Sequence, residues 1–142
     1  MKKLLIKSFD KIIVVLLAIL GVFNSCSQPC EYGEPYADYE LKGVVTDKET
    51  SKPIKNIRIV HQTYRDTTYT DAEGKYAFIY NDNLLEHLDL KIEDIDGEEN
   101  GGEFEAQEID VKFTNADRVK KGDGHWYEGK YEKTQNIELE KK

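Results

Sequence analysis

The sequence of 142 residues contains none of the short motifs that mark the common classes of enzyme. It has no Gly-x-Ser-x-Gly nucleophile turn, no His-Glu-x-x-His zinc helix and no glycine-rich phosphate loop. Its three histidines, His61, His87 and His125, lack the spacing of a zinc site, so we expect them to be structural or surface residues. No catalytic group and no resident cofactor are predicted, and we expect a protein that is not an enzyme.

Long hydrophobic runs are also scarce, and the one that stands out lies near the N-terminus. Four lysines among the first 11 residues precede an uncharged, apolar run over residues 12–23. A permanent transmembrane helix needs roughly 20 apolar residues, and this run is shorter. A basic leader followed by a short apolar run is typical of a secretory signal peptide. We therefore expect residues 1–25 to form an N-terminal signal helix that is removed on export.

Cysteine is rare. Cys26 follows this leader directly, and Cys30 comes shortly after it. The sequence Phe-Asn-Ser-Cys at positions 23–26 resembles a lipobox, in which Cys26 becomes lipidated and is the new N-terminus. The alternative is a disulfide between Cys26 and Cys30, because exported proteins meet an oxidising space. Lipidation uses the Cys26 sulfur, and it would leave Cys30 as a free thiol or as an intermolecular partner. A lipid on Cys26 predicts anchoring to a membrane that faces the periplasm or the cell surface, and we expect the outer membrane.

Positive charge is in deficit after the leader is removed. Residues 1–25 carry a charge of +3, so their loss changes the net charge from −8 to −11. Such an acidic chain is not suited to nucleic acid, and its charge favours solubility. Proline, glycine and polar residues dominate the stretch up to Asp38, which predicts a flexible tether over residues 26–38. The rest, residues 39–142, has the length of one ordinary domain without internal repeats.

The pattern of this domain is that of β-strands. Alternation of period two predicts strands at 41–46 and 57–62, separated by a polar loop that ends at Pro53. A short strand at 67–70 leads into Asp71 and Gly74, which predict a tight hairpin to a strand whose Tyr76, Phe78 and Tyr80 we expect in the core. Further strands are expected at 88–92, 109–113 and 126–139. We predict an antiparallel β-sandwich of about seven strands, transthyretin-like or immunoglobulin-like in type.

The central segment resembles a known domain family. Its order of residues is similar to the carboxypeptidase regulatory-like domain, a transthyretin-like β-sandwich of envelope proteins; the matching positions are Gly43, Val45, Asp47, Thr50, Pro53, Ile54, Ile57, Ile59, Thr70, Asp71, Gly74, Tyr76 and Phe78. Where that family has a glycine before the proline, this chain has Ser51 and Lys52. The resemblance implies no catalysis, because that domain is a non-catalytic appendage of peptidases.

A second resemblance spans nearly the whole chain. The leader, the segment YGEPYADYELKG, the acidic DIDGEENGGEF and the closing WYEGKYEKTQNIELE resemble the small lipoproteins encoded beside radical SAM enzymes in the Bacteroidota. This resemblance implies an address in the cell envelope and a neighbouring modification enzyme. It implies no activity.

The segment DIDGEENGGEF is the most distinctive candidate site. It places Asp94, Asp96, Glu98, Asn100 and Glu103 around three glycines, and Ca²⁺ takes several oxygen ligands from a flexible loop. Its spacing is not that of an EF-hand loop. A calcium site is therefore one interpretation, and a solvated, glycine-rich turn between two strands is the other.

Two further features are candidates for modification or binding. The sequence Asp66-Thr67-Thr68 resembles an O-glycosylation sequon of exported Bacteroidota proteins, which makes Thr67 a candidate site. Trp126, Tyr127 and Tyr131 are interpreted either as a strip on which a sugar or peptide stacks or as core residues at one end of the sandwich.

These features predict a lipid-anchored envelope lipoprotein that acts as a binding or scaffolding module for an unidentified protein or glycan. One alternative is a substrate or dedicated partner of a neighbouring radical SAM enzyme. The other is a calcium-dependent binding module.

Overall fold

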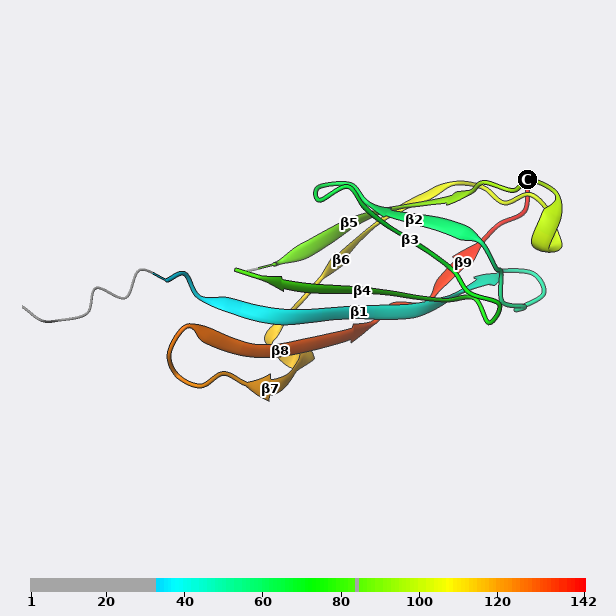
Figure 1. The fold of residues 1–142 in the computed structure, drawn as a ribbon. Coiled ribbons are helices and arrows are strands. Elements are labelled where there is room, and N and C mark those ends of the chain that lie inside the picture. Colours follow the sequence, from blue (N-terminus) through cyan, green and yellow to red (C-terminus); the bar gives the residue numbers. More distant parts are fainter. Residues whose placement is uncertain (1–32, 84) are drawn as a thin grey trace, which may run out of the picture. The chain divides into compact units, whose positions relative to one another are not determined.

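The computed structural model describes residues 33–83 and 85–142, and within them nine strands form two packed sheets (Figure 1). The first sheet has the order β4-β1-β8-β7, and β9 pairs with the end of β1; the second has the order β3-β2-β5-β6. The bounds are β1 Tyr36–Asp47, β2 Ile57–His61, β3 Asp66–Tyr69, β4 Lys75–Asp82, β5 His87–Asp94, β6 Gln107–Lys112, β7 Arg118–Lys121, β8 Tyr127–Thr134 and β9 Ile137–Leu139. Two short 3₁₀ turns, η1 at Glu99–Gly101 and η2 at Asn115–Asp117, join strands. The predicted all-β sandwich is confirmed.

Three details of the strands differ from the prediction. The count is nine in the described residues rather than about seven, because β7 is exposed throughout and the last segment divides into β8 and β9. An exposed strand shows no hydrophobic alternation, so the pattern could not reveal it. The sheets are mostly antiparallel, but β1 runs parallel to both β8 and β9. Residues 36–38, which were expected in the tether, belong to β1, and Ala37 is buried.

The predicted hairpin at Asp71 and Gly74 was half right. The turn is present: Gly74 N–H donates to the Asp71 carbonyl at 3.0 Å, and Gly74 has a φ of 71°. However, the strands on either side do not pair with each other. β3 pairs with β2 in one sheet and β4 pairs with β1 in the other, so this turn carries the chain between the layers. Local turn chemistry fixes a reversal of the chain and does not decide which strands pair.

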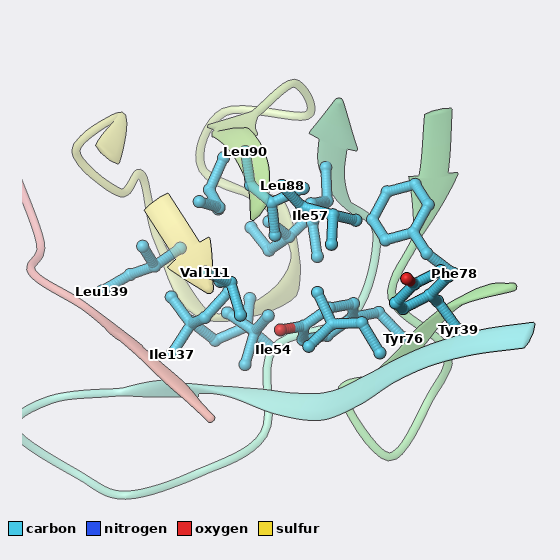
Figure 2. Close-up of a cluster of buried hydrophobic side chains, with 14 of the residues drawn as sticks. Tyr39, Ile54, Ile57, Tyr76, Phe78, Leu88, Leu90, Val111, Ile137 and Leu139 are labelled. Carbon is cyan, nitrogen blue, oxygen red and sulfur yellow. The ribbon is translucent and has the colours of Figure 1, made fainter. Parts of the chain in front are cut away.

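The core fills the space between the inner faces of the two sheets. Alternate residues of β1 and β4 face alternate residues of β2, β5 and β6, as period-two side chains require (Figure 2). As predicted, Tyr76 and Phe78 are buried, and Tyr80 packs against the core at its edge. The other buried apolar residues are Ala37, Tyr39, Leu41, Val45, Ile54, Ile57, Ile59, Leu85, Leu88, Leu90, Ile92, Phe104, Val111, Ile137 and Leu139.

Gly43 on β1 leaves the space that allows both β8 and β9 to lie along this strand. Between β8 and β9 the chain bends so that the Gln135 N–H donates to the Lys42 carbonyl at 2.8 Å. The Gln135 carbonyl then accepts the Tyr76 hydroxyl at 2.7 Å. A Cβ atom on Gly43 would lie 1.8 Å from this carbonyl oxygen and 2.9 Å from the Tyr76 ring. Gly43 is therefore needed for space. We call Gly43, Tyr76 and Gln135 the glycine notch.

We predict that Gly43→Ala lowers the free energy of unfolding by about 1–3 kcal/mol or more, because the added methyl group overpacks the notch. Gly43 is not in the left-handed region, so the loss is steric. Urea unfolding of the full chain measures it. Lys75→Ala, at an exposed position of the neighbouring strand β4, is the control and should change stability by no more than about 0.5 kcal/mol. Equal stability of Gly43→Ala and the wild type would contradict this role.

Tyr76→Phe should cost about 1–3 kcal/mol, because it leaves the Gln135 carbonyl without its side-chain donor inside the protein. The matched control is Tyr69→Phe, the same chemical change at a side chain that is 50% exposed. Thermal melting of both variants separates loss of the buried hydrogen bond from loss of a hydroxyl group in general.

Candidate functional site

A groove with the dimensions of a small-ligand site lies where β1, β3 and β4 come together. Its volume is about 560 Å³, within the roughly 300–1,000 Å³ of typical ligand pockets. Gly43, Val44, Tyr76 and Ala77 supply much of its apolar lining, and the half-exposed ring of Tyr69 stands beside them. The polar lining comes from Lys42, Thr68, Asp71, Lys75, Thr134 and Asn136.

Several polar groups of the groove already have partners. Lys42 Nζ lies 3.4 Å from Glu132 and 3.5 Å from Glu40, both partly exposed carboxylates. Asp71 accepts the backbone N–H groups of Glu73 and Lys75 at 3.0 and 2.8 Å. Lys42 and Asp71 at the rim of the groove therefore already have partners within the protein.

A second cluster of polar groups lies at the other end of β3, around a buried histidine. His61 is only 1% exposed, yet both of its ring nitrogens meet oxygen atoms. Nε2 lies 3.1 Å from Asp89 on β5, and Nδ1 lies 3.1 Å from the Tyr80 hydroxyl on β4. The Tyr80 hydroxyl in turn lies 3.2 Å from Asp66 on β3. We call Asp89, His61, Tyr80 and Asp66 the histidine chain.

Sequence reasoning did not find the histidine chain. The expectation that His61 is structural fits its burial, and the alternation of Ile57, Ile59 and His61 along β2 was the pattern that could have placed it inside. Its partners come from three other strands, and no spacing in the sequence relates them. By contrast, His87 and His125 are exposed, and His87 Nδ1 lies 2.9 Å from Asp110.

The acidic segment that was the leading candidate site is a loop after β5 that is closed by its own hydrogen bonds. Asp94 accepts the N–H groups of Asp96 and Phe104 at 3.1 and 3.0 Å. Asp96 accepts the side-chain amides of Asn56, at 3.0 Å, and Asn100. These hydrogen bonds lower the pKa of Asp96, first of all the one from Asn56, although burial acts in the opposite sense. Both carboxylates therefore have protein partners.

The other two acidic candidate ligands of this loop, Glu98 and Glu103, have different surroundings. Glu98 is exposed, and Glu103 lies 2.5 Å from Lys142 at the end of the chain. Across residues 33–83 and 85–142, no group of three or more histidine, cysteine, aspartate or glutamate side chains is arranged to hold a metal ion. The calcium site stays a prediction.

The three aromatic residues that were interpreted as a stacking strip or as core have different surroundings; Tyr127 and Tyr131 belong to β8, and Trp126 lies just before it. Tyr131 stacks on the buried ring of Tyr39, with ring centroids 5.2 Å apart, and belongs to the edge of the core. Tyr127 donates its hydroxyl hydrogen to Asp38 at 2.8 Å. Trp126 lies against Gly33, where a Cβ atom would be 3.1 Å from the indole. The three side chains do not form one stacking surface.

The modification sites are only partly within the described residues. Thr67 is exposed on β3, the edge strand of its sheet, and its glycosylation stays a prediction. The signal helix, Cys26 and Cys30 lie outside the residues that the structure describes. Within those residues, no helix has the length and hydropathy to cross a membrane.

Comparisons with known proteins do not extend this picture. The chain matches no model of a known protein family, and a search of curated proteins finds no match.

We predict that Asp47, at the end of β1, makes stability depend on pH in the acid range. Burial opposes its ionisation, but the N–H groups of Glu49 and Thr50, the Thr50 hydroxyl and Lys141 outweigh this effect and lower its pKa from 3.8 to about 2. A lowered pKa contributes stability above pH 3.8 that is lost as the pH falls through 2. The stability gap between wild type and Asp47→Asn should therefore narrow from pH 4 to pH 2.

Thermal melting at closely spaced pH values measures this gap. Glu73→Gln, which removes an exposed carboxylate in a turn, is the control and should follow the wild type at every pH. A gap between wild type and Asp47→Asn that stays constant below pH 4 would contradict the assignment.

Proposed function

We propose that this protein is a non-enzymatic lipoprotein of the cell envelope, anchored through a lipid on Cys26, whose β-sandwich acts as a binding or scaffolding module. The observation that carries the proposal is the basic leader and apolar run followed directly by the lipobox-like sequence that ends at Cys26. Attachment through more than one acyl chain, as on bacterial lipoproteins, gives stable anchoring.

The sequence limits how far the folded body can lie from the anchor. Nine residues separate Cys26 from Tyr36, where β1 begins. At 3.3–3.6 Å per residue, such a segment spans at most about 35 Å. A lipid on Cys26 would therefore keep the sandwich within a short distance of the membrane surface.

The form of the sandwich supports the binding part of the proposal. Loops and edges of a rigid β-scaffold are common sites of recognition, and the groove beside β1, β3 and β4 has the volume of a ligand site. The partner class that we expect is a protein or a glycan of the envelope.

We predict that the wild-type chain, expressed in a bacterium with lipoprotein processing, carries acyl chains on Cys26 and sediments with membranes. Cys26→Ser should lose the acyl chains and leave the membrane fraction, while Cys30→Ser should behave as the wild type. Intact mass spectrometry and cell fractionation measure the two effects. Wild-type protein without acyl chains in the aqueous fraction would overturn the anchor.

The same mass measurement tests the alternative that a neighbouring radical SAM enzyme modifies this chain. When the chain is produced together with that enzyme, a mass fully explained by sequence and lipid excludes a stable modification. A further mass difference, mapped to a residue by peptide sequencing, would favour that alternative.

A further inference from the structure

The histidine chain joins both sheets of the sandwich through three short contacts. Reading from one end, Asp89 meets His61 Nε2 at 3.1 Å, His61 Nδ1 meets the Tyr80 hydroxyl at 3.1 Å, and that hydroxyl meets Asp66 at 3.2 Å. The chain begins and ends on a carboxylate, which when ionised can only accept hydrogen bonds. Every contact therefore needs a hydrogen from His61 or Tyr80.

When His61 is neutral, it and Tyr80 do not have enough hydrogens for all three contacts. A neutral imidazole has one N–H and Tyr80 has one O–H, which gives two hydrogens for three contacts. Asp89 requires the N–H on Nε2, since a bare nitrogen would place its lone pair against a carboxylate. The Tyr80 hydroxyl donates its hydrogen to the Asp66 carboxylate, a charge-assisted hydrogen bond, and no hydrogen is left between His61 Nδ1 and the Tyr80 oxygen.

A second proton on His61 changes this pattern without moving the heavy atoms. The imidazolium donates from both nitrogens, so Nδ1 gives its hydrogen to the Tyr80 oxygen. The Tyr80 O–H keeps its hydrogen bond to Asp66. All three contacts carry one hydrogen each.

We propose that His61 is a proton-operated latch between the two sheets. When it takes up a second proton, Nδ1 donates the new hydrogen to the Tyr80 oxygen and so bonds β2 of one sheet to β4 of the other. β3 and β4 are the edge strands of their sheets, and both also line the groove.

The groups around His61 determine when this latch operates. Burial lowers the pKa of His61 from the ordinary value of 6.5, the carboxylates of Asp89 and Asp66 act in the opposite sense, and His87 adds to the lowering. From the turn between β2 and β3, the Tyr64 ring lies 4.8 Å away, and its hydroxyl donates to Asp82. The imidazole is thus neutral at pH 7, and protonation belongs to more acidic solutions.

The latch contributes to stability with a definite sign. Because the pKa of His61 is lower in the folded protein than in the unfolded chain, its neutral form favours folding above pH 6.5. That contribution declines as the pH falls through the folded pKa. The His61–Tyr80 hydrogen bond gained by protonation offsets part of the cost of a buried charge.

The experiment is an NMR titration of the full chain in a mild detergent, which follows the His61 ring and the Tyr80 ring carbon bonded to oxygen. In the wild type, the Tyr80 signal should shift with the same midpoint as His61, because the Tyr80 oxygen gains a hydrogen-bond donor. A Tyr80 signal that does not change through the His61 titration would overturn the proposal, and this measurement requires no variant.

A double-mutant cycle then separates a hydrogen-bonded chain from simple attraction through space. Asp66→Asn should lower the pKa of His61 in the wild type, and this effect should shrink in the Tyr80→Phe background, where no hydroxyl connects the two. An effect of the same size in both backgrounds would show that Asp66 acts only as a distant charge. Asp110→Asn, which removes the carboxylate beside His87, is the matched control and should leave the His61 midpoint close to that of the wild type.

Discussion

The hydrogen bonding of β1 on both of its edges is the constraint on which the rest of the sandwich depends. On one edge β1 pairs with β4, and on the other it pairs first with β8 and then with β9. The C-terminal segment has to bend once to do this, and the bend turns the Gln135 carbonyl toward the core. Gly43 leaves the room for that carbonyl, and Tyr76 satisfies it. The absence of a side chain at Gly43 therefore lets both β8 and β9 pair with β1.

Several aspartates of this acidic chain satisfy backbone groups in its turns. Asp47, Asp71, Asp94 and Asp117 each accept backbone N–H groups from their own loop, as aspartate does in tight turns. A turn whose N–H groups are satisfied by a side chain needs no partner strand. The excess of negative charge, which by composition alone suggests solubility or cation binding, thus has a local structural role at several sites.

Strands and turns could be predicted from the sequence, but the pairing of strands could not. Alternation in the segments that became β1, β2, β4, β5 and β9 predicted the buried faces, because burial on one side of a sheet imposes period two. The turn at Asp71 and Gly74 was equally visible. Its strands joined different sheets because pairing is settled by contacts that are remote in sequence.

The candidate sites show the same division. Asp94 and Asp96 stood out because they are close in sequence, and the structure gives both carboxylates hydrogen-bond partners within the protein. The histidine chain draws one residue from each of four strands, so only the folded chain brings its members together. Composition identified where acidic groups are dense. It could not identify which groups are buried together.

The parallel pairing of β1 with β8 and β9 has a consequence for how the molecule is made. One edge of residues 36–47 pairs with β4, but the other edge finds its partners only at residues 127–139. Most of the chain must therefore be synthesised before β1 can be paired on both edges. Contacts of such wide sequence separation form slowly. The first sheet therefore cannot close over the second edge of β1 until residues 127–139 have been made.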